Sequence, residues 1–242
     1  MKPLFSREEM ENVLNSPRKG SGSGIGLYRE GYRTHGINFW GMKVGSKVQE
    51  FLDRNSNTDW SQSSVLEIGA GTGKNIFELV RIGVNRAVAV EIDSIAISVF
   101  VDTLVRLEEC GLVPEGRVSI VKDDALQFLR HNSERFDIVV CYGVLHVLKQ
   151  QEQLVLLAKS VTNAVAKGGH LILQTITNKY PAPASQPELE GVIVTPRLVK
   201  ELFPKDIWEI ISWDEEDIVH SHLGSEEDHR HGSVRSIFRS LR

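Results

Sequence analysis

The sequence is poor in several features that mark special classes of protein. Its 242 residues include only two cysteines, Cys110 and Cys141, and these lie far apart without the spacing of a disulfide framework or a zinc site. No apolar run is long enough to cross a bilayer, and no basic-then-apolar leader stands at the start. We therefore expect a protein of a reducing compartment, the cytoplasm, without a membrane partner.

Charge of one sign is not in excess either. The chain has 28 Lys and Arg against 32 Asp and Glu, a formal net charge of -4. Proteins that hold nucleic acid by its phosphates usually carry a basic excess, so we expect a small-molecule partner and no nucleic acid. The hydrophobic content of 41% and the charged content of 25% are those of an ordinary soluble globular protein. The sequence leaves the oligomeric state open.

The most informative stretch is a short apolar run that ends near an acid and is followed by a glycine at every second position. It reads Val65-Leu66-Glu67-Ile68-Gly69-Ala70-Gly71-Thr72-Gly73-Lys74. The pattern predicts a buried strand, a sharp turn and a helix that begins near Lys74. Glycines would allow positive φ in the turn and would leave the backbone bare, so that a ligand could approach it.

The spacing of these glycines excludes two phosphate-binding loops. The dinucleotide fingerprint is G-x-G-x-x-G, but Gly73 follows Gly71 by two residues rather than three. A phosphate loop, G-x-x-x-x-G-K-[ST], would need a glycine at Ile68 and a hydroxyl residue at Asn75. A glycine-rich turn that binds no ligand is the alternative interpretation of the stretch.

Strands and helices are expected to alternate from about residue 64 to residue 175. The expected helices cover 75–83, 94–110 and 150–166, and the expected later strands cover 87–91, 118–121, 136–142 and 170–175. Such alternation predicts a parallel sheet covered on both faces, with ligands outside the carboxyl ends of the strands. Residues 208–218 and 233–241 alternate well enough to predict an antiparallel pair that closes the sheet.

Polar residues stand where these strands are expected to end. Glu91 ends the second strand about twenty residues after the glycines, the position that accepts hydrogen bonds from a ribose in nucleotide-binding α/β folds. Asp124 follows the third strand, with Asp123 as an alternative one residue earlier, and Tyr142 ends the fourth. Together with Glu67, these residues predict a ligand site at one edge of the sheet.

In their order E-x-G-x-G-x-G, the four residues Glu67, Gly69, Gly71 and Gly73 resemble the class I S-adenosylmethionine-dependent methyltransferases. The resemblance covers about residues 60–175. It implies an α/β, Rossmann-like fold, doubly wound, with a mostly parallel seven-stranded sheet and an antiparallel last strand. It also implies S-adenosyl-L-methionine as the cofactor and S-adenosyl-L-homocysteine as the product.

The resemblance further implies which residues hold the cofactor. The glycine loop would wrap its methionyl part, Glu91 would hold both ribose hydroxyls, and Asp124 with the small Ala125 would meet the adenine amino group. The cofactor-binding residues expected on this basis are Glu67, Gly69, Ala70, Gly71, Gly73, Glu91, Ile92, Asp124, Ala125 and Cys141.

The first 58 residues are expected to form an N-terminal helical arm or lid, and residues 59–242 the methyltransferase domain. Ser6 and Glu9 have the spacing of a capping box, and residues 19–24 have the composition of a flexible joint. Residues 26–40 are rich in aromatics, including Tyr32 and Trp40. These rings either pack a helix that ends near Asn55 onto the domain or close over the substrate.

Histidines are the candidates for acceptor chemistry. Methyl transfer is an in-line displacement that needs oriented reactants, exclusion of water and, for some acceptors, a base, for which histidine is suited near neutral pH. His146 follows the fourth strand and either faces the acceptor or only packs. Four more histidines flank a short acidic run near the end of the chain, namely His220, His222, His229 and His231. They would line an acceptor pocket, hold a divalent metal with the acids, or form an exposed polar turn.

The prediction is an enzyme that moves the methyl group of S-adenosylmethionine to an O, N or S atom of a small molecule. We expect His146 and His222 to be catalytic, and no metal. The expected substrate-binding residues are Tyr32, Trp40, Tyr142, His220, His229 and His231. The alternatives are methylation of RNA or protein, and a regulator that binds the cofactor without turnover.

Overall fold

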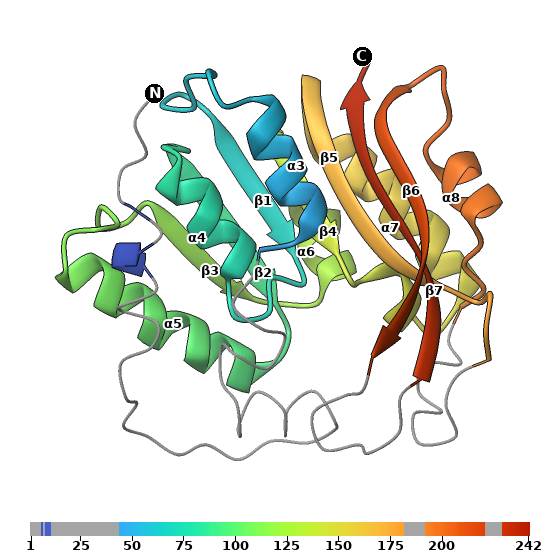
Figure 1. Ribbon diagram of the computed structural model, residues 1–242, viewed down its shortest axis with the longest axis horizontal. Coiled ribbons are helices and arrows are strands. Elements are labelled where there is room, and N and C mark those ends of the chain that lie inside the picture. The colour runs from blue at the N-terminus through green and yellow to red at the C-terminus, as the bar shows by residue number, and fades with distance from the viewer. Residues whose placement is uncertain (1–5, 7, 11–43, 182–191, 221–228) are drawn as a thin grey trace. The chain divides into compact units, whose positions relative to one another are not determined.

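The computed structural model describes residues 6, 8–10, 44–181, 192–220 and 229–242 (Figure 1). Their strands form a seven-stranded sheet in the order β3-β2-β1-β4-β5-β7-β6, with six parallel strands and β7 antiparallel. This confirms the predicted fold class. By their internal contacts the residues divide into two compact units, Met1–Asp124 and Ala125–Arg242.

The first unit holds three parallel strands and the helices that follow them. Its elements are α3 (Ser46–Arg54), β1 (Ser64–Ile68), α4 (Lys74–Arg81), β2 (Arg86–Glu91), α5 (Ser94–Glu109) and β3 (Val118–Lys122). β2 lies between β1 and β3, with Leu66 beside Val88 and Val90 beside Val121. β1 and β2 are almost continuously apolar because α4 and α5 pack on them and bury them.

The ends of α5 follow from local chemistry. Asp93 precedes the helix, and its Oδ1 accepts hydrogen bonds from the backbone amides of Ile95 and Ala96. At the other end Gly111 has a φ of 70° and ends the helix. The predicted extents of α4 and α5 therefore agree with the structure to within two residues.

Helix α3 ends at Arg54, next to the predicted end at Asn55, and buries Val48, Phe51 and Leu52. Further back, the capping box of Ser6 and Glu9 is confirmed, because each backbone amide donates to the side chain of the other residue, at 2.6 and 3.1 Å. The rest of the first predicted helix, the glycine-serine joint and the aromatic segment with Tyr32 and Trp40 lie outside the described residues. The division between an arm, 1–58, and a domain, 59–242, stays a prediction.

The second unit holds the remaining four strands. Its elements are α6 (Ala125–His131), β4 (Phe136–Tyr142), the 3-10 turn η2 (Leu145–Val147), α7 (Gln151–Ala164), β5 (Val165–Thr177), α8 (Pro196–Leu202), β6 (Trp208–His220) and β7 (His229–Ser240). β4 and β5 are parallel, and β7 runs antiparallel between β5 and β6. The predicted antiparallel pair is thus confirmed, and α7 packs on β4 and β5.

Two elements of this unit differ from their predictions. α6 was not expected, because its seven residues bury only Leu126 and Leu129 and are too few to give a helical repeat. β5 begins at Val165 rather than at His170, so the end of the helix predicted to reach residue 166 belongs to the strand. The Gly168-Gly169 pair lies within β5 where its register with β4 shifts, which is the irregularity of a bulge.

Aromatic rings fill the core beneath β6 and β7. Phe203, at the end of α8, lies 5.3 Å from Phe238 and 6.0 Å from Trp208, measured between ring centroids. α8 starts with the Thr195 hydroxyl accepting from the Leu198 amide and with Pro196 in the first turn. In the part of the chain that the structure describes, no helix is long and apolar enough to cross a membrane.

Candidate active site

The glycine loop has the conformation that its sequence predicted. Gly69, Gly71 and Gly73 have φ values of 67°, 55° and 85°, the left-handed region that glycine occupies without strain. The backbone amides of Gly69 and Ala70 both donate to the carbonyl oxygen of Val90, at 2.9 and 3.1 Å. The loop therefore folds back over the carboxyl end of β2.

Gly73 has a second role that spacing could not show. A Cβ atom at this position would lie 2.5 Å from the ring of Phe100 on α5. That ring also meets Phe77 of α4 edge-on, with centroids 5.0 Å apart. A glycine at 73 is thus required for the packing of α4 against α5 as well as for the turn.

Glu91 joins the end of β2 to the glycine loop. Its Oε2 accepts from the amide of Gly71, and its Oε1 accepts from the amides of Ile92 and Asp93, each at 2.8 Å. Burial raises the pKa of the carboxyl group, and these three amides oppose that rise. A carboxylate offers about four lone-pair sites, so roughly one remains for a ligand, fewer than the two ribose hydroxyls of the prediction would use.

Glu67, in β1, is more deeply buried than Glu91, with 1% of its surface exposed. Its Oε1 accepts from Asn75 Nδ2 at 2.7 Å, whereas its Oε2 has no hydrogen-bond partner among the described residues. Burial raises the pKa of this group to about 8, against the lowering effects of the Asn75 side chain, of Lys74 and of the nearby Ile76 backbone amide. Burial also lowers the pKa of Lys74 to about 8.

The residues of this edge fit the cofactor that the resemblance implies. A buried oxygen without a partner costs about 1–3 kcal/mol, which an ammonium group such as that of a methionyl moiety would offset at Glu67 Oε2. Ile92 is 61% exposed, beside Glu91, and offers an apolar surface to an aromatic base. Asp123 and Asp124 follow β3, and Asp123 Oδ1 accepts from the Asp124 amide at 2.8 Å.

Most of the predicted cofactor-binding residues come together in the first unit, at the carboxyl ends of β1, β2 and β3. They are Glu67, Gly69, Ala70, Gly71, Gly73, Glu91, Ile92 and Asp124. The two others belong to the second unit. Ala125 is the first residue of α6, and Cys141 is buried within β4.

In the second unit, His146 lies in η2 and is bound to the carboxyl end of β5. Its Nδ1 accepts from the backbone amide of Ile176 at 3.2 Å and lies 3.4 Å from the hydroxyl of Thr175. Since a backbone N–H can only donate, Nδ1 carries no proton and the neutral ring is protonated on Nε2. Burial, with a smaller effect of His231, lowers the pKa of His146 to about 4.

Other polar side chains are buried around this histidine. His231 on β7 is 4% exposed, and the hydroxyl of Ser233 donates to the carbonyl oxygen of Thr175 at 3.3 Å. A Cβ at Gly232 would lie 2.4 Å from the hydroxyl oxygen of Thr177, so β5 and β7 approach closely here. We call His146, Thr175, Thr177, His231 and Ser233 the histidine cluster.

The remaining predicted acceptor residues are only partly described. Tyr142 is the last residue of β4 and is half-buried. His220 and His229 are paired where β6 ends and β7 begins, but their side chains, and all of His222, lie outside the described residues. Among the described residues no group of three His, Cys, Asp or Glu could hold a metal ion. The roles predicted for these histidines stay predictions.

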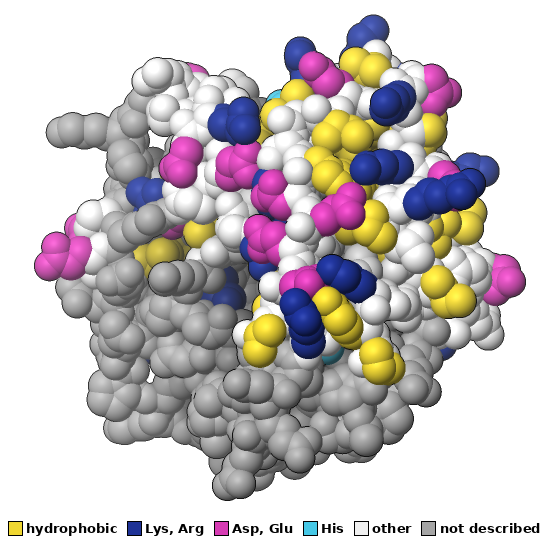
Figure 2. Space-filling model, turned by 45° about the vertical axis from the view of Figure 1, so that its right-hand side comes forward, with side chains coloured by type: hydrophobic (Ala, Val, Ile, Leu, Met, Phe, Trp, Pro, Cys, Tyr) yellow, Lys and Arg dark blue, Asp and Glu magenta, His cyan; other side chains and the backbone are white. Residues whose placement is uncertain are grey.

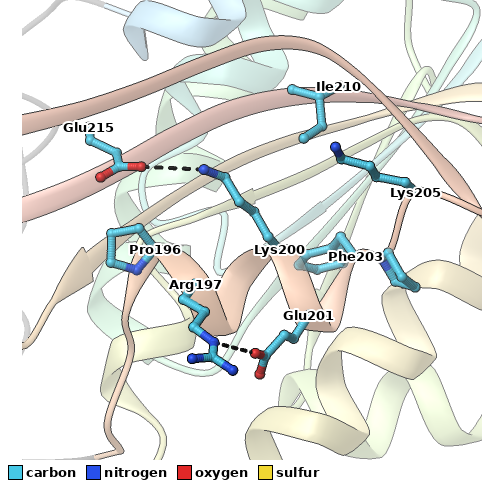
Figure 3. Close-up of a pocket in the computed structure, with 9 residues that line it drawn as sticks. Pro196, Arg197, Lys200, Glu201, Phe203, Lys205, Ile210 and Glu215 are labelled. Atoms are coloured by element: carbon cyan, nitrogen blue, oxygen red, sulfur yellow. Dashed lines mark hydrogen bonds and ion pairs between the residues drawn. The ribbon is translucent and has the colours of Figure 1, made fainter.

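A surface groove of about 680 Å³ lies between α8 and β6 (Figure 3). Four of the five charged side chains that line it are paired with one another: Lys200 lies 3.6 Å from Glu215, and Arg197 lies 2.8 Å from Glu201. None of the residues predicted for the site lines it. We therefore place the candidate active site at the strand ends, outside this groove.

These features together define a class I S-adenosylmethionine-dependent methyltransferase: a glycine loop with left-handed φ values, a buried acid in β1, a second acid at the end of β2, and the observed strand order. A family model described as a methyltransferase domain matches residues 40–233, and the chain belongs to that family. The protein is an enzyme that uses S-adenosyl-L-methionine and releases S-adenosyl-L-homocysteine. No curated protein matches it in sequence.

Solved structures share the fold at low sequence identity. TehB from Haemophilus influenzae aligns with a TM-score of 0.65 and 17% identity over 87% of this chain, which spans only 66% of TehB. The N-methyltransferase NodS from Bradyrhizobium japonicum WM9, solved with S-adenosyl-L-homocysteine, aligns with a TM-score of 0.54 and 19% identity. The alignment covers 81% of this chain and 86% of NodS. The putative RNA methyltransferase PH1948 from Pyrococcus horikoshii aligns with a TM-score of 0.58 and 16% identity. The alignment covers 98% of this chain and 100% of PH1948.

Proposed function

We propose that the protein transfers the methyl group of S-adenosylmethionine to an O, N or S atom of a small-molecule acceptor. The cofactor supplies a methyl group activated by a sulfonium, and the loop residues with Glu67 and Glu91 would hold it. The observation that carries the proposal is the histidine cluster, which gathers buried hydrogen-bonding groups at the carboxyl end of β5. Ligands of doubly wound sheets bind outside such strand ends.

We propose that His146 acts toward the acceptor as a hydrogen-bond donor. Its Nδ1 is engaged by the Ile176 amide, so the proton on Nε2 is the one that the ring can present. A fixed donor would orient an oxygen or nitrogen of the acceptor for in-line displacement. Action of His146 as a base would first require the Ile176 hydrogen bond to break. His222 remains the other proposed base.

The surface charge supports a small acceptor over RNA. Basic side chains of β7 are paired with acids of β6: Arg235 lies 2.9 Å from Glu216, and Arg230 lies 3.0 Å from Asp217. Lys and Arg alternate with Asp and Glu over the described part of this face (Figure 2). RNA binding needs a broad excess of cations, which such pairing removes on this face.

Methylation of RNA is the second candidate, since the fold extends over the whole of a putative RNA methyltransferase. The experiment that separates the two offers labelled cofactor to a panel of phenols, thiols, amines and carboxylates, and in parallel to total RNA and protein extracts. We expect label in one class of small molecule. Label only in RNA or protein would refute the small-molecule proposal, and cofactor binding without any transfer would favour the regulator.

The role of His146 is tested by two matched substitutions. His146→Asn keeps an acceptor near the position of Nδ1, and His146→Gln keeps a polar group near the position of Nε2. If donation to the acceptor matters, His146→Gln retains more turnover than His146→Asn, and the difference appears in kcat. Equal and full turnover in both variants would limit His146 to packing.

A further inference from the structure

A chain of two hydrogen bonds connects the buried acid of the cofactor site to the start of helix α3. The backbone amide of Gly45 donates to Asn75 Oδ1 at 2.9 Å, and Asn75 Nδ2 donates to Glu67 Oε1 at 2.7 Å. Gly45 immediately precedes α3, Asn75 is the second residue of α4, and Glu67 lies in β1 (Figure 1). Three elements are thus tied together through one asparagine.

The direction of both hydrogen bonds is fixed from the Gly45 end. Because a backbone N–H can only donate, the Asn75 atom that faces Gly45 is the amide oxygen. The amide nitrogen of Asn75 then faces Glu67 and requires an acceptor there, which is Oε1. The other oxygen of Glu67, Oε2, is left to meet a ligand, and it is the atom without a partner among the described residues.

We propose that Asn75 is a positioning residue that couples cofactor binding at Glu67 to the placement of the start of α3. Gly45 has no side chain to cap the helix, so the described anchor of its amide is the side chain of Asn75. The inference depends on the cofactor of the family and is independent of the proposed acceptor.

The coupling has a simple electrostatic cause. A cationic group at Glu67 Oε2 favours the ionised carboxylate, and a hydrogen bond to an ionised acceptor is roughly twice as strong as a neutral one. The Asn75 amide, polarised by that bond, becomes a better acceptor for the Gly45 amide. Linkage is reciprocal: the factor by which the bound cofactor strengthens the Gly45 hydrogen bond is also the factor by which loss of that hydrogen bond weakens cofactor binding.

The sharpest test removes one hydrogen-bond donor, the amide of Gly45, which lies thirty residues from Asn75 in the sequence. Gly45 has φ -54° and ψ 134°, values that proline adopts, so Gly45→Pro deletes the donor without demanding a new backbone conformation. Gly45→Ala keeps the donor and is the matched control. By calorimetry with S-adenosyl-L-homocysteine we expect Gly45→Pro to bind roughly three- to tenfold more weakly than Gly45→Ala.

The hydrogen bond between Asn75 and Glu67 is tested with Asn75→Asp. The new carboxylate can still accept from Gly45, but it cannot donate to Glu67 and repels it. We expect S-adenosyl-L-homocysteine to bind more than about tenfold more weakly, the loss of a hydrogen bond to a charged group. Asn85→Asp adds the same charge at an exposed turn of the same unit and should bind like wild type.

A measurement on the unmodified protein guards against variants that fail to fold. Hydrogen exchange of the Gly45 amide, followed by NMR, should slow several-fold when S-adenosyl-L-homocysteine is added. Unchanged exchange at Gly45, or equal affinities of Gly45→Pro and Gly45→Ala, would overturn the coupling. If none of the offered acceptors were methylated, these binding and exchange results would still stand, because none of the measurements uses an acceptor.

Discussion

The amide of Gly71 donates to Glu91 Oε2 at 2.8 Å, so the acid predicted to hold the ribose also holds the loop. Together with the amides of Ile92 and Asp93, this hydrogen bond makes Glu91 a structural part of the turn. A defect in a Glu91 variant therefore has two sources, a lost ligand contact and a loosened loop.

We expect Glu91→Ala to weaken binding of S-adenosyl-L-homocysteine by roughly a hundredfold, because a buried charge-assisted network worth about 1.5–3 kcal/mol is lost. Glu91→Gln keeps one oxygen but turns an NH₂ group toward backbone donors, and we expect an intermediate loss. Calorimetry gives the affinities, and exchange of the Gly71 amide in the cofactor-free proteins reports the loop. Wild-type affinity in Glu91→Ala would contradict the assignment.

Glu67 should make the cofactor-free protein less stable as the pH rises. Its folded pKa is about 8 against an ordinary 4.5, so the folded state holds a proton that the unfolded state loses between these values. The stabilisation is complete below pH 4.5 and is lost by about pH 8, on the order of a few kcal/mol. Urea unfolding of wild type and Glu67→Gln across this range should show the difference. Parallel curves would count against a protonated Glu67.

His146 should act in the opposite direction. Its folded pKa of about 4 lies below the ordinary 6.5, so its contribution is present above pH 6.5 and is lost as the pH falls to 4. The loss amounts to up to about 3 kcal/mol. His146→Asn preserves an acceptor for the Ile176 amide but does not titrate, and its unfolding free energy should fall less on acidification. An equal fall in both proteins would disprove the interpretation.

Gly73→Ala should be far more damaging than a glycine substitution with similar φ. Gly111 has φ 70° with no atom within 4 Å of an added Cβ, so Gly111→Ala measures the backbone strain alone, about 1 kcal/mol. Gly73→Ala adds a clash with Phe100 that should cost about 1–3 kcal/mol more. The second substitution Phe100→Leu should recover part of that excess in urea unfolding. Equal losses at 73 and 111 would show that the ring moves aside freely.

The sequence was sufficient for the features that depend on spacing along the chain. The glycines at every second position, the acid after β2 and the alternating strands and helices predicted the fold and most of the cofactor edge. These patterns are local, since the carboxyl ends of parallel strands meet at one edge by geometry alone.

Features that depend on contacts between distant segments were missed. Nothing near Gly73 in the sequence indicates Phe100, and nothing beside Asn75 indicates Gly45, thirty residues earlier. The tautomer of His146 is set by an amide from β5, so a histidine chosen as a base proved to have its Nδ1 already engaged. Only the packed structure contains these pairings.

The order of strands within the second unit has a consequence for biosynthesis. β7 is made after β5 and β6, yet it lies between them. Until β7 has left the ribosome, β5 and β6 each present an unpaired edge that can recruit other chains. A nascent protein arrested before residue 229 should therefore be open to protease and prone to aggregate, whereas a chain that includes β7 should resist both. Pulse proteolysis of chains stalled before and after β7 would test this.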